Sequence, residues 1–89
     1  MIRRHMVLHG RVQGVGLRFT ARTAANMYGC TGWVRNDPEG TVTLEIQGSE
    51  DAIGRVIQAI ERGLFIRIEN MESRSIPPLE NERGFHTEA

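Results

Sequence analysis

The sequence predicts a two-layer α+β sandwich, in which two helices cover one face of a mainly antiparallel sheet. Three observations lead to this fold class. Residues 41–47 alternate strictly between polar and apolar side chains, which is typical of a strand with one buried face. Residues 17–28 and 50–62 instead carry apolar side chains at helical spacing. The chain has 89 residues, the length of one domain, so we expect a single core shared by residues 1–89.

The first part of the chain predicts a strand, a loop and a helix. Residues 3–9 form the first expected strand, and three glycines within residues 10–16 predict a loop. The helix that follows runs from residue 17 or 18 to residue 28, and alanines along it predict close packing. One side of this helix is expected to carry three residues spaced four apart, with the alanines alongside. They are Phe19, Thr23 and Met27.

The middle of the chain predicts a hairpin followed by the second helix. Residues 30–35 form the second expected strand, and residues 36–40 consist of typical turn residues. The alternating strand 41–47 comes next. Ser49 is a candidate cap for the second helix, which the pair Arg62 and Gly63 closes.

The last part of the chain predicts one long strand and one short edge strand. In residues 65–74, Met71 joins the face of Ile66 and Ile68 only if a bulge shifts the phase. Residues 79–83 are expected as a loop and residues 84–88 as an edge strand. The resulting order, βαββαβ plus a short C-terminal strand, predicts the split βαβ or ferredoxin-like arrangement.

Composition excludes several classes of function. The 11 basic and 11 acidic residues cancel, which argues against nucleic-acid binding. No apolar run approaches the ~18 residues of a membrane span, and no signal-peptide pattern opens the chain, so we expect a cytoplasmic protein without a membrane partner. A single cysteine excludes an internal disulfide and a cysteine-based zinc site. All 11 basic residues are arginine, which excludes a lysine-dependent phosphate loop and Schiff-base chemistry.

Residues 10–18 read Gly-Arg-Val-Gln-Gly-Val-Gly-Leu-Arg and join the first strand to the first helix. Glycines allow backbone N–H groups to converge there, and the start of the helix adds partial positive charge. Arg18 adds a planar fork of donors at the same point. The segment therefore predicts a small cup for a dianionic phosphoryl group. The alternative is a glycine-rich turn beside a surface arginine. A dinucleotide site is excluded because Phe19 stands where its third glycine belongs.

Asn36 opens the turn after the second strand, and two roles remain open for it. An asparagine at the start of a turn commonly hydrogen-bonds its own backbone. If the strand instead lies beside the glycine loop, the amide can reach a bound ligand. Because an amide both donates and accepts, it would then hold a water molecule in line for attack.

Residues 10–18, together with Gly-Trp-Val-Arg-Asn at 32–36 and Gly40, resemble the acylphosphatase family. The resemblance extends over nearly the whole chain. It implies a ferredoxin-like fold and hydrolysis of the carboxyl–phosphate anhydride of small acyl phosphates, with inorganic phosphate as a product. It assigns phosphate binding to Arg18 with the loop amides, and orientation of the water to Asn36. It implies no metal and no cofactor.

The catalytic residues expected from this resemblance are Arg18 and Asn36. The expected substrate-binding residues are Arg11, Val12, Gln13, Gly14, Val15, Gly16 and Leu17. Leu17 departs from the family pattern, which commonly has an aromatic residue there, but the change removes no donor. The alternative function is a module that binds an acyl or carbamoyl phosphate without turning it over. We expect a monomer that binds no nucleic acid.

Further expectations concern the surroundings of one tryptophan and several arginines. Trp33 is expected in the core, and Arg22 is expected to form a salt bridge. Arg3, Arg4 and Arg11 are expected on the solvated surface, and the alternative is that they guide anionic substrates toward the site.

Overall fold

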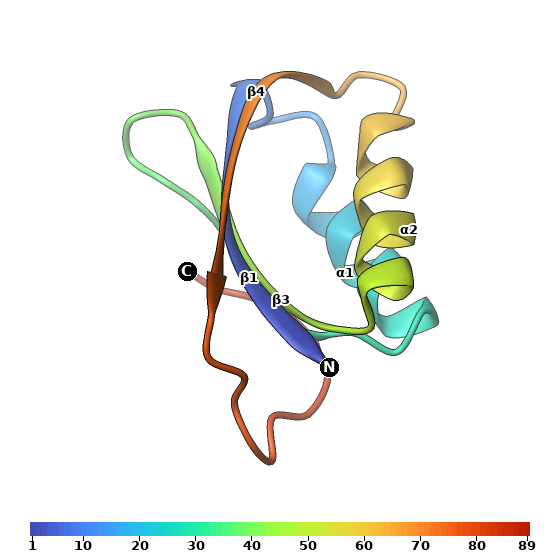
Figure 1. The fold of residues 1–89 in the computed structure, drawn as a ribbon. Coiled ribbons are helices and arrows are strands. Elements are labelled where there is room, and N and C mark those ends of the chain that lie inside the picture. The colour runs from blue at the N-terminus through green and yellow to red at the C-terminus, as the bar shows by residue number, and fades with distance from the viewer.

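A sheet and a pair of helices form the two layers of the molecule (Figure 1). The computed structural model describes residues 1–89. Both helices cover the same face of the sheet, so the predicted ferredoxin-like sandwich is confirmed. The strands are β1 (Ile2–Arg11), β2 (Thr31–Asn36), β3 (Val42–Gly48), β4 (Arg67–Ile76) and β5 (Phe85–Thr87), and the helices are α1 (Leu17–Met27) and α2 (Glu50–Glu61).

The sheet has the strand order β4-β1-β3-β2-β5. All neighbouring strands run antiparallel except β2 and β5, which pair in parallel at one edge. The apolar residues of the alternating strand β3 are fully buried beneath the helices, as predicted. They are Val42, Leu44 and Ile46.

A bulge in β4 changes which face of the sheet its side chains point to. The sequence predicted that Met71 would share the core-facing side only if such a bulge were present. His9 of β1 pairs with Asn70, whereas Gly10 pairs with Ile68, so Glu69 is an extra residue in β4. Ile68 and Met71 both pack against the core as a result.

Gly10 belongs to β1 rather than to the expected loop. Its φ is +124°, and a Cβ at this position would overlap the backbone carbonyl of Arg67. Only a glycine lets the two backbones approach this closely beside the bulge. The connection between β1 and α1 is therefore shorter than expected and runs over residues 12–16.

Helix α1 packs on the sheet through small side chains. Its buried residues are Leu17, Ala21, Ala24 and Ala25. Phe19 and Met27 are 65% and 70% exposed, so the side of the helix that they share with Thr23 faces away from the core. Each helical residue turns the chain by about 100°, which places residue 19 across the helix from residues 17 and 21.

The face of the sheet away from the helices is partly covered by residues 77–84, which we call the crossing segment. Figure 1 shows it running past the end of the sheet from β4 to β5. Gln47 exchanges two hydrogen bonds with the backbone of Leu79, each 2.8 Å long. Because of this cover, Gln47 is buried although it lies on the polar side of β3. Thr43 is buried on the same side, where it donates a hydrogen bond to Asp37.

Two expectations about this face are wrong. Arg3 is only 2% exposed, and it donates hydrogen bonds to Glu82, Glu45 and Gln47 instead of lying on the solvated surface. Trp33 is half-buried on the same face, outside the core, with the Arg35 guanidinium carbon 5.0 Å from its ring centroid. In both cases the strand period turns the side chain away from the helices.

Neither helix has the length and apolar character needed to cross a bilayer. The single cysteine, Cys30, is a buried free thiol, and its burial raises the pKa of that thiol.

Candidate active site

A cavity of about 190 Å³ lies where the β1–α1 connection meets the end of β2. β1 and β2 both pair antiparallel with β3, so they run in the same direction and end at the same edge of the sheet. This topology brings Arg18 and Asn36 to one cavity. The lining residues are Val12, Gly14, Gly16, Leu17, Arg18, Phe19 and Asn36.

Two glycines of the β1–α1 connection lie in the cavity wall, and both have the left-handed backbone conformation. Gly14 has φ +72° and Gly16 has φ +79°. A Cβ at either position would meet no protein atom within 4 Å, so backbone conformation rather than lack of room favours glycine here. Gly16 is also the N-cap of α1, and the helix therefore starts at the cavity wall.

The N-terminus of α1 is left open, whereas that of α2 is closed by its own side chains. At α2, Ser49 Oγ accepts a hydrogen bond from the N–H of Ala52, and two acidic residues stand in the first turn. At α1 no side chain caps the helix and no acidic residue lies in the first turn. The N–H donors and partial positive charge of α1 thus remain available, and Arg18 adds a full charge in the same turn. This arrangement suits an anion.

The turn that follows Asn36 is held by Asp37. Its carboxylate accepts hydrogen bonds from Thr43 Oγ1 at 2.6 Å, Thr41 Oγ1 at 2.8 Å and Arg35 Nε at 3.1 Å. Burial acts to raise the pKa of Asp37, but these three hydrogen bonds outweigh it and hold the pKa below its usual range. Asn36 takes no part in this network and lines the cavity instead.

Gln13 ties the β1–α1 connection to the same turn. Its Nε2 atom donates to the carbonyl oxygen of Asp37 at 2.7 Å and to that of Thr41 at 2.9 Å. Both N–H groups of the amide are therefore engaged within the protein. The structure thus gives this side chain a bracing contact between the loop and the turn, and it does not place Gln13 in the cavity lining.

The other predicted substrate-binding residues differ in where their side chains lie. Val12 and Leu17 are buried in the core, so they offer the cavity mainly backbone. Val15 is half-buried against the core. Arg11 lines a separate hollow with residues 64–67. Phe19 lines the cavity although sequence reasoning did not include it, and the only signal for it was its position next to Arg18.

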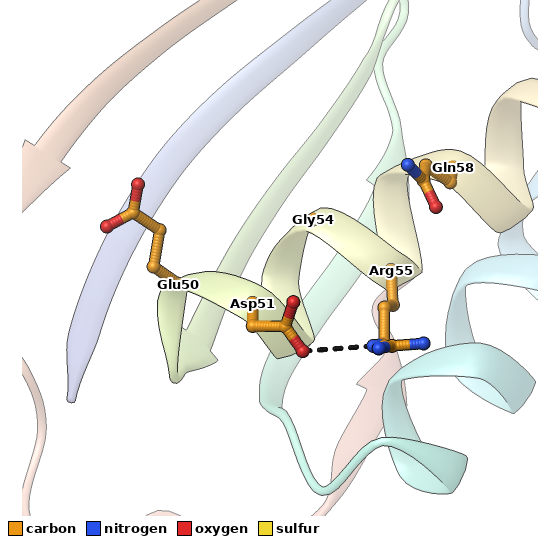
Figure 2. A pocket seen from close by; sticks show the side chains of 5 residues that line it. All are labelled: Glu50, Asp51, Gly54, Arg55 and Gln58. Atoms are coloured by element: carbon orange, nitrogen blue, oxygen red, sulfur yellow. Dashed lines mark hydrogen bonds and ion pairs between the residues drawn. The ribbon is translucent and has the colours of Figure 1, made fainter.

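A larger hollow of about 630 Å³ lies along the exposed side of α2 (Figure 2). Arg55 Nε donates to Asp51 Oδ2 there at 2.9 Å, so these two charges are paired with each other. None of the residues predicted for substrate binding lines it. We therefore place the candidate site at the smaller cavity, where an open helix N-terminus, Arg18 and Asn36 converge. No group of three or more His, Cys, Asp or Glu side chains is arranged to hold a metal ion.

The sequence model of the acylphosphatase family matches residues 4–87. The chain belongs to the acylphosphatase family. An acylphosphatase from Clostridium acetobutylicum is 37% identical over 87 residues, which cover 96% of each chain. The crystal structure of acylphosphatase from Bacillus subtilis superposes with a TM-score of 0.91 at 28% identity and covers all of both chains. HypF from T. kodakarensis gives a TM-score of 0.84 at 26% identity over the whole of this chain, but over only 12% of its own.

Membership of the acylphosphatase family makes this chain an enzyme that hydrolyses acyl phosphates and releases inorganic phosphate. The resemblance noted from residues 10–18 and 32–40 is thereby confirmed, as are the fold and the enzyme class that it implied.

Proposed function

We propose that in this acylphosphatase the loop of residues 12–18 and the Arg18 guanidinium hold the phosphoryl group of the substrate, while Asn36 positions the attacking water. The observation that carries the proposal is the shared cavity. Arg18 comes from the first turn of α1 and Asn36 from the end of β2, yet both line the same small space.

Positive charge and hydrogen-bond donors in the cavity wall support the phosphoryl site. The open N-terminus of α1 offers N–H groups, and Gly14 and Gly16 turn the preceding backbone along the cavity wall. Arg18 supplies planar donors that can bind two phosphoryl oxygens at once. Donors fixed in this way neutralise the charge on the equatorial oxygens in the transition state without reorganising.

The hydrolytic step needs a positioned water and no strong base. The water oxygen attacks phosphorus, and the bond between phosphorus and the carboxylate oxygen breaks, which releases carboxylate and inorganic phosphate. Carboxylate is a good leaving group, so little proton transfer is required. The cavity lining agrees with this, because it contains no histidine and no carboxylate. The Asn36 amide can accept from the water and donate to a phosphoryl oxygen, which holds the water in line.

The substitution Asn36→Ala tests this division of roles. We expect kcat for benzoyl phosphate to fall about 10³-fold or more, because positioning supplies several kcal/mol of the barrier. Inhibition by inorganic phosphate should stay nearly unchanged, since Arg18 and the loop remain. Steady-state kinetics give both values, on protein shown to be folded by circular dichroism. Asn70→Ala is the matched control, because Asn70 is an exposed strand asparagine outside the cavity.

Three results would contradict the proposal. If Asn36→Ala weakens phosphate inhibition as much as it lowers kcat, Asn36 is a phosphate ligand. If it changes neither quantity, Asn36 is only a turn residue. Saturable binding of benzoyl phosphate by the unmodified chain, with no turnover above spontaneous hydrolysis, would support the binding module instead.

A further inference from the structure

We infer that Phe19 forms the subsite for the acyl group and gives the enzyme a preference for acyl phosphates with aromatic acyl groups. The inference rests on the proposed function, in which the phosphoryl group lies against the loop and Arg18. It concerns the opposite end of the substrate, the acyl group.

Phe19 is the one large apolar surface that the cavity offers to a ligand. Val12 and Leu17 also line the cavity, but they are 1% and 2% exposed and are committed to the core. Phe19 is 65% exposed. Single exposed aromatic residues are ordinary on protein surfaces, and Phe65 has the same exposure on a different hollow. The position of Phe19 in the cavity wall is therefore what distinguishes it.

The direction of the substrate places its acyl group near this ring. With the phosphoryl oxygens held by the loop and Arg18, the anhydride oxygen and the acyl carbon must extend toward the cavity mouth. Phe19 directly follows Arg18 in the first turn of α1 and faces away from the core, so its ring is available at that mouth. An acyl group leaving the phosphoryl site can therefore meet it.

Arg22 restricts the ring from one turn further along the helix. Its guanidinium carbon lies 6.0 Å from the centroid of Phe19, in the range of a cation–π contact. The salt bridge expected for Arg22 is not formed, and the arginine contacts the ring instead. The ring keeps exposed surface for a ligand beside this contact, because Phe19 is 65% exposed.

Aromatic groups gain most from such a surface. A benzoyl ring can stack on Phe19 or meet its edge, whereas the methyl of an acetyl group has little area to bury. The contact is present in the bound substrate and in the transition state alike. Its loss should therefore raise KM and leave kcat unchanged.

The test compares benzoyl phosphate with acetyl phosphate in the unmodified enzyme and in Phe19→Ala. We expect Phe19→Ala to raise KM for benzoyl phosphate about three- to tenfold. KM for acetyl phosphate, kcat for both substrates and inhibition by inorganic phosphate should stay unchanged. Phe19→Tyr should retain the preference, because it keeps the ring. Phe65→Ala is the matched control and should have no effect.

Three outcomes would overturn the inference: KM for the two substrates rises equally in Phe19→Ala, KM for benzoyl phosphate does not change, or Phe65→Ala has the same effect as Phe19→Ala. Failure of the proposed function looks different. It would appear as an unchanged kcat or a weakened phosphate inhibition in Asn36→Ala, or as nearly normal activity in Arg18→Lys, with benzoyl phosphate and acetyl phosphate affected alike.

Discussion

Arg18 contributes both a charge and a shape to the cavity wall. Lysine would retain the charge but concentrate it on a single ammonium, which cannot bind two phosphoryl oxygens in one plane. The chain contains no lysine, so arginine is its only permanent cation for this purpose. The side chain is exposed, and its removal leaves no buried group without a partner.

The substitution Arg18→Lys separates charge from shape. We expect kcat/KM for benzoyl phosphate to fall about 10²-fold or more, because the planar donors are lost in the transition state. The free energy of unfolding should stay within about 0.5 kcal/mol of the unmodified value, as for other exposed positions. Arg62→Lys, at the exposed C-terminal end of α2, is the control. Nearly normal activity in folded Arg18→Lys protein would contradict the role given to Arg18.

At the scale of elements, the two helices divide stability and binding between them. α2 satisfies its own first turn with Ser49, Glu50 and Asp51, and it buries Ile53, Val56 and Ile60. α1 buries mostly alanines and leaves its N-terminus open at the cavity. The helix at the proposed phosphoryl site therefore lacks a side-chain cap, which typically contributes about 1 kcal/mol.

Within α2, a substitution at Gly54 can stabilise the folded protein. It lies on the exposed side of the helix (Figure 2), and a Cβ there would meet no atom within 4 Å. Gly54→Ala should raise the free energy of unfolding by roughly 0.5–1 kcal/mol, because alanine loses less backbone entropy in a helix. Urea unfolding measures this, and kcat/KM should not change. Gly32→Ala is the contrasting variant, since its Cβ would overlap the backbone carbonyl of Glu45 and destabilise the fold. A loss of stability in Gly54→Ala would contradict the prediction.

Local patterns predicted the elements well but predicted the surroundings of single residues less well. The alternation of 41–47 and the spacing of Ile53, Val56 and Ile60 depend only on neighbours along the chain, and both were confirmed. The exposed side of α1 was harder to predict from sequence, because both the apolar Phe19 and the small alanines are candidates for burial in the core. Close packing on a sheet favours the alanines, and this depends on the sheet rather than on the helix alone.

Contacts between distant segments account for what the sequence could not show. The burial of Arg3 and Gln47 depends on where the crossing segment lies, and no local pattern encodes that path. Five residues of the 10–18 motif do line the cavity, but three residues predicted to bind the substrate do not, namely Arg11, Gln13 and Val15. The bracing contact of Gln13 escaped prediction because its partners are carbonyls of a turn 24 and 28 positions away.

At the scale of the whole molecule, Arg3 and Glu82 join the first strand to the crossing segment. Arg3 Nη1 donates to Glu82 Oε1 at 2.6 Å and Nη2 donates to Oε2 at 3.1 Å, a bidentate pair. Burial acts to raise the pKa of Glu82, but hydrogen bonds from Arg3 and Thr31, together with the charge of Arg3, outweigh it and hold the pKa below its usual range. Burial also opposes the charge of Arg3, yet Glu82 and Glu45 raise its pKa overall.

This pair should make stability sensitive to acid. A carboxyl group whose folded-state pKa lies below its unfolded value, about 4.3, stabilises the fold fully above that value. The contribution disappears as the pH falls through the folded-state pKa. We expect the free energy of unfolding of the unmodified protein to drop below about pH 4. Glu82→Gln should cost about 1–3 kcal/mol at pH 7 and should show a smaller drop in acid.

Urea unfolding at several pH values between 7 and 3 measures both effects. Glu80→Gln is the control, because Glu80 is exposed in the same crossing segment. Equal behaviour of the two variants would show that the pair with Arg3 does not stabilise the fold.

The Arg3–Glu82 pair also bears on the order in which the chain completes its fold during synthesis. The ribosome adds Glu82 79 positions after Arg3. Until then the guanidinium in a central strand lacks its closest carboxylate, and β2 lacks β5 at its outer edge. The residues proposed for catalysis all lie within the first 36 positions. A nascent chain therefore carries every side chain proposed for catalysis well before it can complete the sheet that holds them in place.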